Sequence, residues 1–299
     1  MLIWSPMARS LLNRLPKPIL RLLPRRWRRQ DPAVAVVRLS GAIGAVMPFR
    51  TGLSMASAAP VLERAFAMRG TKAVAIVVNS PGGSPVQSHL IYKRIRALAA
   101  EKKKPVFVFV EDVAASGGYM LACAGDEIFA DPSSLVGSIG VVSASFGFTG
   151  LIERLGIERR VHTAGENKSM LDPFRPEDPK DIERLKGIQA EVHRMFVDLV
   201  RASRGEKLKE AEAPDLFTGA VWVGEEALRI GLIDGIGDLR GVMRARFGDK
   251  VQLRLIPATR PSVIARWLGR PGFVPDSLVD PGAVIGAMEE RALWARWGL

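Results

Sequence analysis

Two consecutive segments of the chain share one pattern: an uninterrupted apolar run, a turn containing glycine, and apolar residues at helical spacing. In the first segment the run is Ala73–Val78 (AVAIVV), the turn contains Gly82 and Gly83, and a helix is predicted over Val86–Glu101. A run that is apolar at every position is typical of a parallel strand buried on both faces. This pattern therefore predicts a strand-turn-helix unit.

The second segment repeats this plan further along the chain. Its β-branched and aromatic run Val106–Val110 predicts a strand, the pattern breaks at Val113–Gly118, and small, unbranched residues predict a helix over Tyr119–Ala124. Ser116 is expected where the strand gives way to the helix. Two such units in succession predict an α/β fold.

The hydrophobic pattern also predicts strands and helices before and after these two units. The other expected elements are strands at Ala33–Leu39 and Ile128–Ala130 and helices over Met55–Met68, over about 178–204, and up to Gly231. The uncharged stretch Pro132–Ile152 is interpreted as buried sheet and turns. Residues 283–297 can form an amphipathic helix that contacts a partner subunit, the core or a membrane.

The two glycine turns are candidates for a shared site. Crossovers between parallel strands place both turns at the carboxyl edge of one sheet, so Gly82 and Gly83 are expected to face Ser116 and Gly117. Unpaired backbone N–H groups there would stabilise an oxyanion on a substrate bonded to Ser116, and glycine allows close approach. A helix cap with a tight turn is the simpler interpretation. A phosphate cradle is a third, although neither turn has the spacing of a P-loop or dinucleotide fingerprint.

Positive charge is concentrated at the start of the 299-residue chain. The net charge is +12, and residues 1–30 carry eight basic side chains and no acidic one. The remainder is nearly balanced, which argues against nucleic-acid binding. Leucines and tryptophans interleave with the arginines, so this leader is interpreted either as disordered or as lying on an anionic membrane surface. No apolar run reaches the roughly 20 residues of a membrane span, and no cleavable signal peptide is recognised.

Cysteine and histidine are scarce. The single cysteine, Cys123, permits neither an intrachain disulfide nor a thiolate metal site. Three histidines, His89, His162 and His193, argue against a histidine-rich metal centre and offer few candidates for a histidine base. We therefore expect no metal ion and no cofactor.

Four short blocks, in order along the chain, carry a family resemblance. They are Asn79-Ser80-Pro81-Gly82-Gly83, Asp112-Val113-Ala114-Ala115-Ser116-Gly117-Gly118-Tyr119, Gly137-Ser138-Ile139-Gly140-Val141, and Gly165-x-x-Lys168-Ser169-x-x-Asp172-Pro173-Phe174. Each block alone is weak, because Ser-Pro-Gly-Gly also resembles the wider Clp-protease and crotonase superfamily. Together they resemble the signature of the signal peptide peptidase A family of serine peptidases, in its short, single-domain form.

The resemblance implies a Ser-Lys dyad, with Ser116 as nucleophile and Lys168 as general base. Ser138 matches the serine that hydrogen-bonds the lysine, and the oxyanion donors would be backbone N–H groups of the glycine turns, at Gly82, Gly83 and Gly117. A lysine accepts a proton only when neutral, so burial would have to lower its pKa from about 10.4 towards 7. The family fold is a crotonase-like α/β core that assembles into ring-shaped homo-oligomers, with each site complete in one subunit or formed between two.

Two features depart from the family pattern. Members commonly carry an N-terminal spanning anchor, which is not recognised here, and Asn167 stands where an aromatic residue often precedes the lysine. The first departure favours a cytoplasmic protein, at the inner face of the membrane if residues 1–30 bind lipid. We expect a basic leader at 1–31, a crotonase-like peptidase domain at 32–250, and a helical extension at 251–299 that provides oligomer contacts.

Three functions compete. The first is a serine endopeptidase that hydrolyses hydrophobic peptides, such as signal-peptide remnants or membrane-derived and unfolded segments, through an acyl-enzyme. The second is a crotonase-like acyl-CoA hydratase or isomerase, which shares the paired N–H groups but usually relies on glutamates that neither turn supplies. The third is a non-catalytic scaffold on the membrane surface, motivated by the basic leader. The ordered set of Ser116, Ser138 and Lys168 favours the first, with peptides as its substrates.

Overall fold

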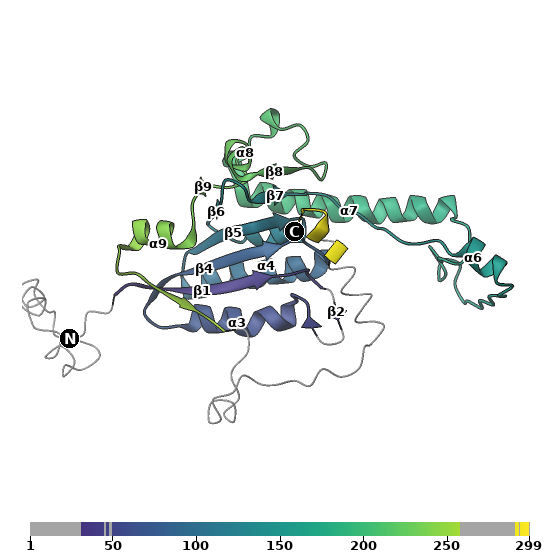
Figure 1. Ribbon diagram of the computed structural model, residues 1–299, viewed down its shortest axis with the longest axis horizontal. Helices are drawn as coiled ribbons and strands as arrows, with labels where there is room; N and C mark the ends of the chain where they lie inside the picture. The colour runs from purple at the N-terminus through teal and green to yellow at the C-terminus, as the bar shows by residue number, and fades with distance from the viewer. Residues whose placement is uncertain (1–30, 45, 48–49, 258–290, 293, 299) are drawn as a thin grey trace, which may run out of the picture.

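An eight-stranded sheet forms the core of the computed structural model, which describes residues 31–44, 46–47, 50–257, 291–292 and 294–298 (Figure 1). The main path β10-β1-β4-β5-β6-β9 is parallel throughout, whereas β7 pairs parallel with the end of β5 and antiparallel with β8. The strands are β1 (Ala33–Ser40), β4 (Thr71–Ser80), β5 (Val106–Ala115), β6 (Glu127–Ala130), β7 (Leu135–Gly137), β8 (Val221–Val223), β9 (Gly235–Ile236) and β10 (Gln252–Leu255), with β2 (Val46–Met47) and β3 (Arg50–Thr51) in a separate hairpin.

Helices cover both faces of this sheet. The helical elements are α3 (Met55–Ala67), α4 (Pro85–Lys102), α5 (Gly117–Ala122), α6 (Thr149–Arg154), α7 (Pro179–Arg204), α8 (Gly224–Arg229), α9 (Leu239–Phe247) and the short 3-10 turns Gly205–Lys207 and Glu210–Glu212. On one face, α3, α4, α5 and the end of α7 bury a large apolar cluster that includes Leu62, Ile91 and Phe196. On the other face, α9 contributes Met243 to a smaller cluster with Phe107. The core therefore has helix, sheet and helix layers.

The observed elements confirm the predicted α/β core of repeated strand-turn-helix units. β4 with α4, and β5 with α5, follow the two predicted units, and Asp178 caps the long helix by accepting a hydrogen bond from the N–H of Lys180. One boundary differs. β5 does not end before the turn but continues to Ala115, through a register shift described below.

The interpretation of Pro132–Ile152 as buried is wrong for its second half. Residues 141–178, called the arm below, leave the core and project beyond the far end of α7 (Figure 1). Within the arm the side chains of Val142 and Phe146 are 75% and 79% exposed. The absence of charge was therefore not a sign of burial in the chain's own core.

The terminal predictions fall largely outside the described residues. Residues 1–30 of the basic leader lie there, as do residues 258–290, and the last described residues, 291–292 and 294–298, show a short helical segment. Among the residues that the structure describes, no helix is both long enough and apolar enough to cross a bilayer.

Candidate active site

Ser116 lies at the turn from β5 into α5, with a backbone conformation that residues other than glycine rarely adopt. Its φ is 53° and its ψ is −121°, a conformation that costs on the order of 1–3 kcal/mol and persists only where the surroundings impose it. Here the Ser116 N–H donates to the carbonyl of Gly137 (2.8 Å), and its own carbonyl accepts from the N–H of Tyr119 (2.9 Å). The side chain makes no capping hydrogen bond. Ser116 therefore occupies the N-cap position of α5 in a tight turn, but its hydroxyl does not cap the helix.

The Gly82 turn packs directly against Ser116. A Cβ at Gly82, whose φ is 103°, would lie 2.7 Å from the Ser116 Cβ and 2.8 Å from the carbonyl oxygen of Ala115. At Gly83, whose φ is 138°, a Cβ would lie 2.1 Å from the carbonyl oxygen of Ile43. Both positions therefore require glycine, and the two turns lie side by side, as expected from the topology.

A third segment, which the sequence indicated only as a turn after β1, completes this arrangement. The N–H of Ile43 donates to the carbonyl of Gly82 (2.8 Å), and the N–H of Ser84 donates to the carbonyl of Ile43 (2.8 Å). Ile43 thereby holds the turn that contains Gly82 and Gly83 by two backbone hydrogen bonds. Its only signal in the sequence is its place between two glycines, Gly41 and Gly44, and these do not specify a partner.

Two backbone N–H groups beside Ser116 have no hydrogen-bond partner among the described residues, those of Gly83 and Gly117. The N–H of Gly82 instead donates to Ser80 Oγ (3.2 Å), so Gly82 is not a free donor and its contribution is close packing. Gly83 and Gly117 line a small pocket of about 20 Å³ together with Ser116. The pocket is lined by Gly83, Pro85, Ser116, Gly117, Met120, Gly140, Val141, Val192 and Phe196. Two free donors and a free hydroxyl thus meet at one opening with apolar walls.

Ser138 directly follows Gly137, whose carbonyl accepts the hydrogen bond from the Ser116 N–H. It too has a positive φ, 53°, and its N–H donates to the carbonyl of Ala220 (2.7 Å). Next to it, the carbonyl of Ile139 accepts from Nε2 of His193 on α7 (3.2 Å), which gives this histidine a structural contact. No histidine lines the Ser116 pocket in the described chain.

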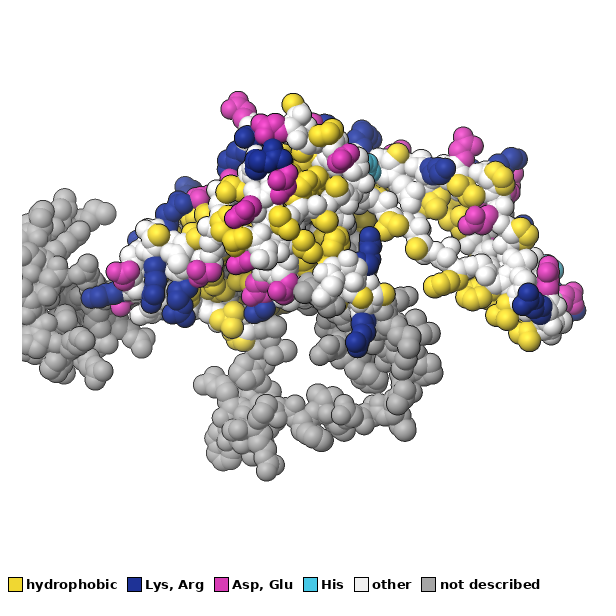
Figure 2. Space-filling model, turned by 45° about the horizontal axis from the view of Figure 1, so that its top comes forward, with side chains coloured by type: hydrophobic (Ala, Val, Ile, Leu, Met, Phe, Trp, Pro, Cys, Tyr) yellow, Lys and Arg dark blue, Asp and Glu magenta, His cyan; other side chains and the backbone are white. Residues whose placement is uncertain are grey.

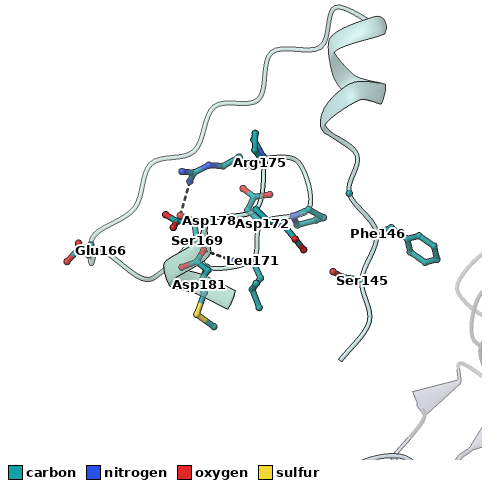
Figure 3. A pocket seen from close by; sticks show the side chains of 14 residues that line it. Ser145, Phe146, Glu166, Ser169, Leu171, Asp172, Arg175, Asp178 and Asp181 are labelled. Carbon is teal, nitrogen blue, oxygen red and sulfur yellow. Dashed lines mark hydrogen bonds between the residues drawn. The ribbon is translucent and has the colours of Figure 1, made fainter. Parts of the chain in front are cut away.

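Lys168 is not among the described residues that line the Ser116 pocket. It is exposed on the arm, and its neighbours Glu166 and Ser169 line a separate pocket of about 150 Å³ (Figure 3). Asp181 of α7 lines this arm pocket, while Val192 of the same helix lines the Ser116 pocket. Because a helix rises 1.5 Å per residue, these two positions are roughly 16 Å apart along α7.

The segment after Lys168 is nevertheless ordered by polar and aromatic contacts. Asp172 forms an ion pair with Arg159 and accepts a hydrogen bond from the N–H of Phe174 (3.0 Å). Hydrogen bonding from Arg159 is the main cause of a lowered pKa for the Asp172 carboxyl. The Arg159 guanidinium lies 4.9 Å from the centroid of the Phe174 ring, and that ring packs against Phe148. The arm therefore has its own local structure.

No set of three or more histidine, cysteine, aspartate or glutamate side chains in the described ranges could hold a metal ion. The site is instead made of a serine, backbone N–H groups and apolar walls. These groups suit attack by a hydroxyl on a carbonyl carbon, with the N–H groups placed to stabilise the resulting oxyanion.

Comparison with known proteins identifies the family. The chain is 54% identical to a protein of Brucella abortus named Na(+)/H(+) antiporter NhaA, over 98% of this chain and 41% of that protein. It is 33% identical to the chloroplastic serine protease SPPA of Arabidopsis thaliana, over 77% of this chain and 35% of that protein. It thus spans about two fifths of the length of these relatives.

A solved structure also matches: a mutant of the 1510-N membrane-bound stomatin-specific protease in complex with a substrate peptide. The TM-score is 0.45 at 17% identity, over 80% of this chain and 96% of that one. The sequence profile of Peptidase family S49 matches residues 99–251, which include Ser116, Ser138 and Lys168. The resemblance indicated by the four sequence blocks is thereby confirmed, and the chain belongs to peptidase family S49.

Proposed function

We propose that this chain is a serine endopeptidase in which Ser116 is the nucleophile and Lys168 the general base. The observation that carries the proposal is a strained serine without a capping bond, beside two unpaired amide groups. The Ser116 oxygen would attack the peptide carbonyl while its proton passes to a neutral Lys168 amine. The N–H groups of Gly83 and Gly117 would stabilise the oxyanion. The lysine would return the proton to the leaving amine, and water would then hydrolyse the acyl-enzyme.

Lys168 would be supplied by a second copy of the chain. Two observations support this: the separation along α7 described above, and the apolar side chains along the arm (Figure 2). These exposed residues are Val142, Phe146, Leu151, Leu155, Ile157 and Val161. Apolar surface of this kind marks an interaction site. Docking of the arm on a neighbour would also remove Lys168 from solvent. In a closed ring of copies, every arm would dock on a neighbour and every Ser116 would receive a Lys168.

The walls of the Ser116 pocket favour hydrophobic peptides with small side chains near the cleaved bond. Met120, Val141 and Phe196 are apolar, and the pocket that they help to line is small. Remnants of signal peptides and unfolded, membrane-derived segments contain such sequences.

A fluorophosphonate probe read by intact mass tests the dyad. The wild-type chain should gain one adduct, whereas Ser116→Ala and Lys168→Ala should gain none. Mixing the two inactive variants under conditions of subunit exchange should restore labelling, because a mixed assembly combines an intact Ser116 with an intact Lys168. Recovery would support a site formed between copies. Normal labelling of Lys168→Ala would contradict its role as the base.

A position at the membrane surface is part of the proposal. The basic leader and the antiporter name of the Brucella relative both support it. The full chain should float with vesicles containing anionic lipid, and deletion of residues 1–30 should abolish flotation while preserving fluorophosphonate labelling. Equal flotation of both forms would exclude the leader as the lipid contact.

A further inference from the structure

The ladder between β4 and β5 changes register just before the two turns of the site. Val78 pairs with Val110, but the next recorded pair is Ser80 with Ala114. Across this interval β5 therefore carries two more residues than β4. Such an insertion bends a strand and re-aims the residues that follow it. The residue that follows β5 is Ser116.

Asn79 spans this irregularity with its side chain. Its Oδ1 accepts a hydrogen bond from the N–H of Val113 (3.2 Å), and its Nδ2 donates to Oδ2 of Asp112 (2.5 Å). The inserted residues move the N–H of Val113 out of register with the backbone of β4. The Asn79 side chain therefore takes the place of a backbone acceptor for that N–H. The second bond involves a charged acceptor, which makes it stronger than a bond between neutral groups. Asn79 thus clamps the inserted part of β5 to β4.

The same residue is tied to the other two segments of the site. Its backbone carbonyl accepts from the N–H of Gly41 (3.0 Å), at the start of the turn that carries Ile43. It directly precedes Ser80, whose hydroxyl donates to the Gly41 carbonyl (2.8 Å) and accepts from the N–H of Gly82 (3.2 Å). Asn79 therefore joins the end of β5 to the two turns that position Gly83.

We propose that Asn79 and Asp112 form a positioning clamp that sets the Ser116 hydroxyl relative to the N–H groups of Gly83 and Gly117. Neither side chain lines the Ser116 pocket, so the clamp acts through the backbone. Its effect is on the alignment of the reacting groups. The inference rests on the proposed serine chemistry at Ser116.

A reciprocal exchange of the two side chains tests the clamp. Asn79→Asp places two carboxylates together and removes the N–H donor, so the contact between residues 79 and 112 should be lost. The double variant Asn79→Asp/Asp112→Asn restores one donor and two acceptors in the same geometry. Because a misplacement of about 1 Å can slow a reaction about 100-fold, Asn79→Asp should lower the maximal rate of fluorophosphonate labelling by about 10- to 100-fold. The half-saturating probe concentration should stay near the wild-type value, and the double variant should recover most of the rate.

Glu111→Gln is the matched control, because Glu111 precedes Asp112 and pairs with Arg38 without bonding to Asn79. It should label like the wild type. Asp112→Ala, at an exposed side chain, provides a second opening of the clamp if Asn79→Asp does not fold. Unchanged labelling in the opened variants, or a double variant as slow as Asn79→Asp, would overturn the clamp. Absence of labelling in the wild type would overturn the serine chemistry itself.

Discussion

The surroundings of Ser116 and of Lys168 differ in how they are held. Ser116 is fixed by backbone hydrogen bonds to Gly137 at the end of β7 and to Tyr119 of α5, and residues near it such as Tyr119 and Leu121 are fully buried. Lys168 lies on an arm whose apolar side chains face solvent. One half of the proposed dyad is thus built by folding, while the other would be completed by assembly. Variants that change one half and spare the other can separate these contributions.

The largest effect is expected at Gly83. In Gly83→Ala the new methyl group would meet the Ile43 carbonyl, and the positive φ of the residue would be strained. The turn must shift and take its N–H group out of line. Loss of one oxyanion donor lowers turnover by about 100- to 1,000-fold, so fluorophosphonate labelling should fall by about that factor. Gly187→Ala, at an exposed glycine of α7 with open space around it, is the control and should label normally. Normal labelling of Gly83→Ala would exclude this turn from the site.

The next largest effect should be on folding, at the core end of α7. Arg204, which is 1% exposed, forms two hydrogen bonds with Asp234. Burial opposes ionisation of Asp234, but hydrogen bonds from Arg204 and Lys207 outweigh it and lower the pKa of the carboxyl. Asp234→Asn leaves Arg204 buried without its counter-ion and should lower the free energy of unfolding by about 3 kcal/mol at pH 7.

The pH dependence of that loss follows from the direction of the pKa shift. A carboxyl whose pKa is lower in the folded state stabilises the protein above its unfolded pKa of about 3.9. The stabilisation disappears as pH falls through the lower, folded value. Denaturant unfolding should thus show a gap between wild type and Asp234→Asn at neutral pH that narrows below about pH 4. Glu158→Gln, in an exposed ion pair of the arm, should unfold like the wild type at both pH values.

The smallest change in the free energy of unfolding is expected for Phe146→Asp. The same substitution should weaken assembly. The side chain is 79% exposed, so Phe146→Asp should change the free energy of unfolding by less than about 0.5 kcal/mol. It would place a charge in the proposed contact between copies. Sedimentation should show smaller assemblies, and Ser116 labelling should fall with them. Leu255→Asp, an exposed apolar position on edge strand β10, should leave assembly intact. Unchanged assembly in Phe146→Asp would contradict docking through the arm.

The hydrophobic pattern predicted correctly those strands whose side chains are buried in the core of the same chain. The runs at Ala73 and Val106 are buried on both faces, and both became central strands. The continuation of β5 to Ala115 was not predicted, because Glu111 and Asp112 interrupt the apolar run. Their side chains leave the core at the register shift, so the strand continues without burying them.

The arm could not be predicted for a different reason. An uncharged stretch such as Pro132–Ile152 has the composition of a buried segment, and composition does not state whether the covering surface belongs to the same chain. The motif containing Lys168 likewise specifies a residue type, whereas its distance from Ser116 depends on the path of the arm. Both features belong to segments whose contacts are not supplied by the described core.

The buried thiol of Cys123 can serve as a probe of local opening of the protein. It lies at the end of α5, 2% exposed, and burial raises the pKa of its thiol to about 12. In the closed protein it is therefore protonated and out of reach of thiol reagents. Modification can proceed only when the core around Cys123 opens, so its rate reports the free energy of that opening. The same chain thus offers a serine whose labelling would measure alignment of the site and a thiol whose labelling would measure opening of the core beneath it.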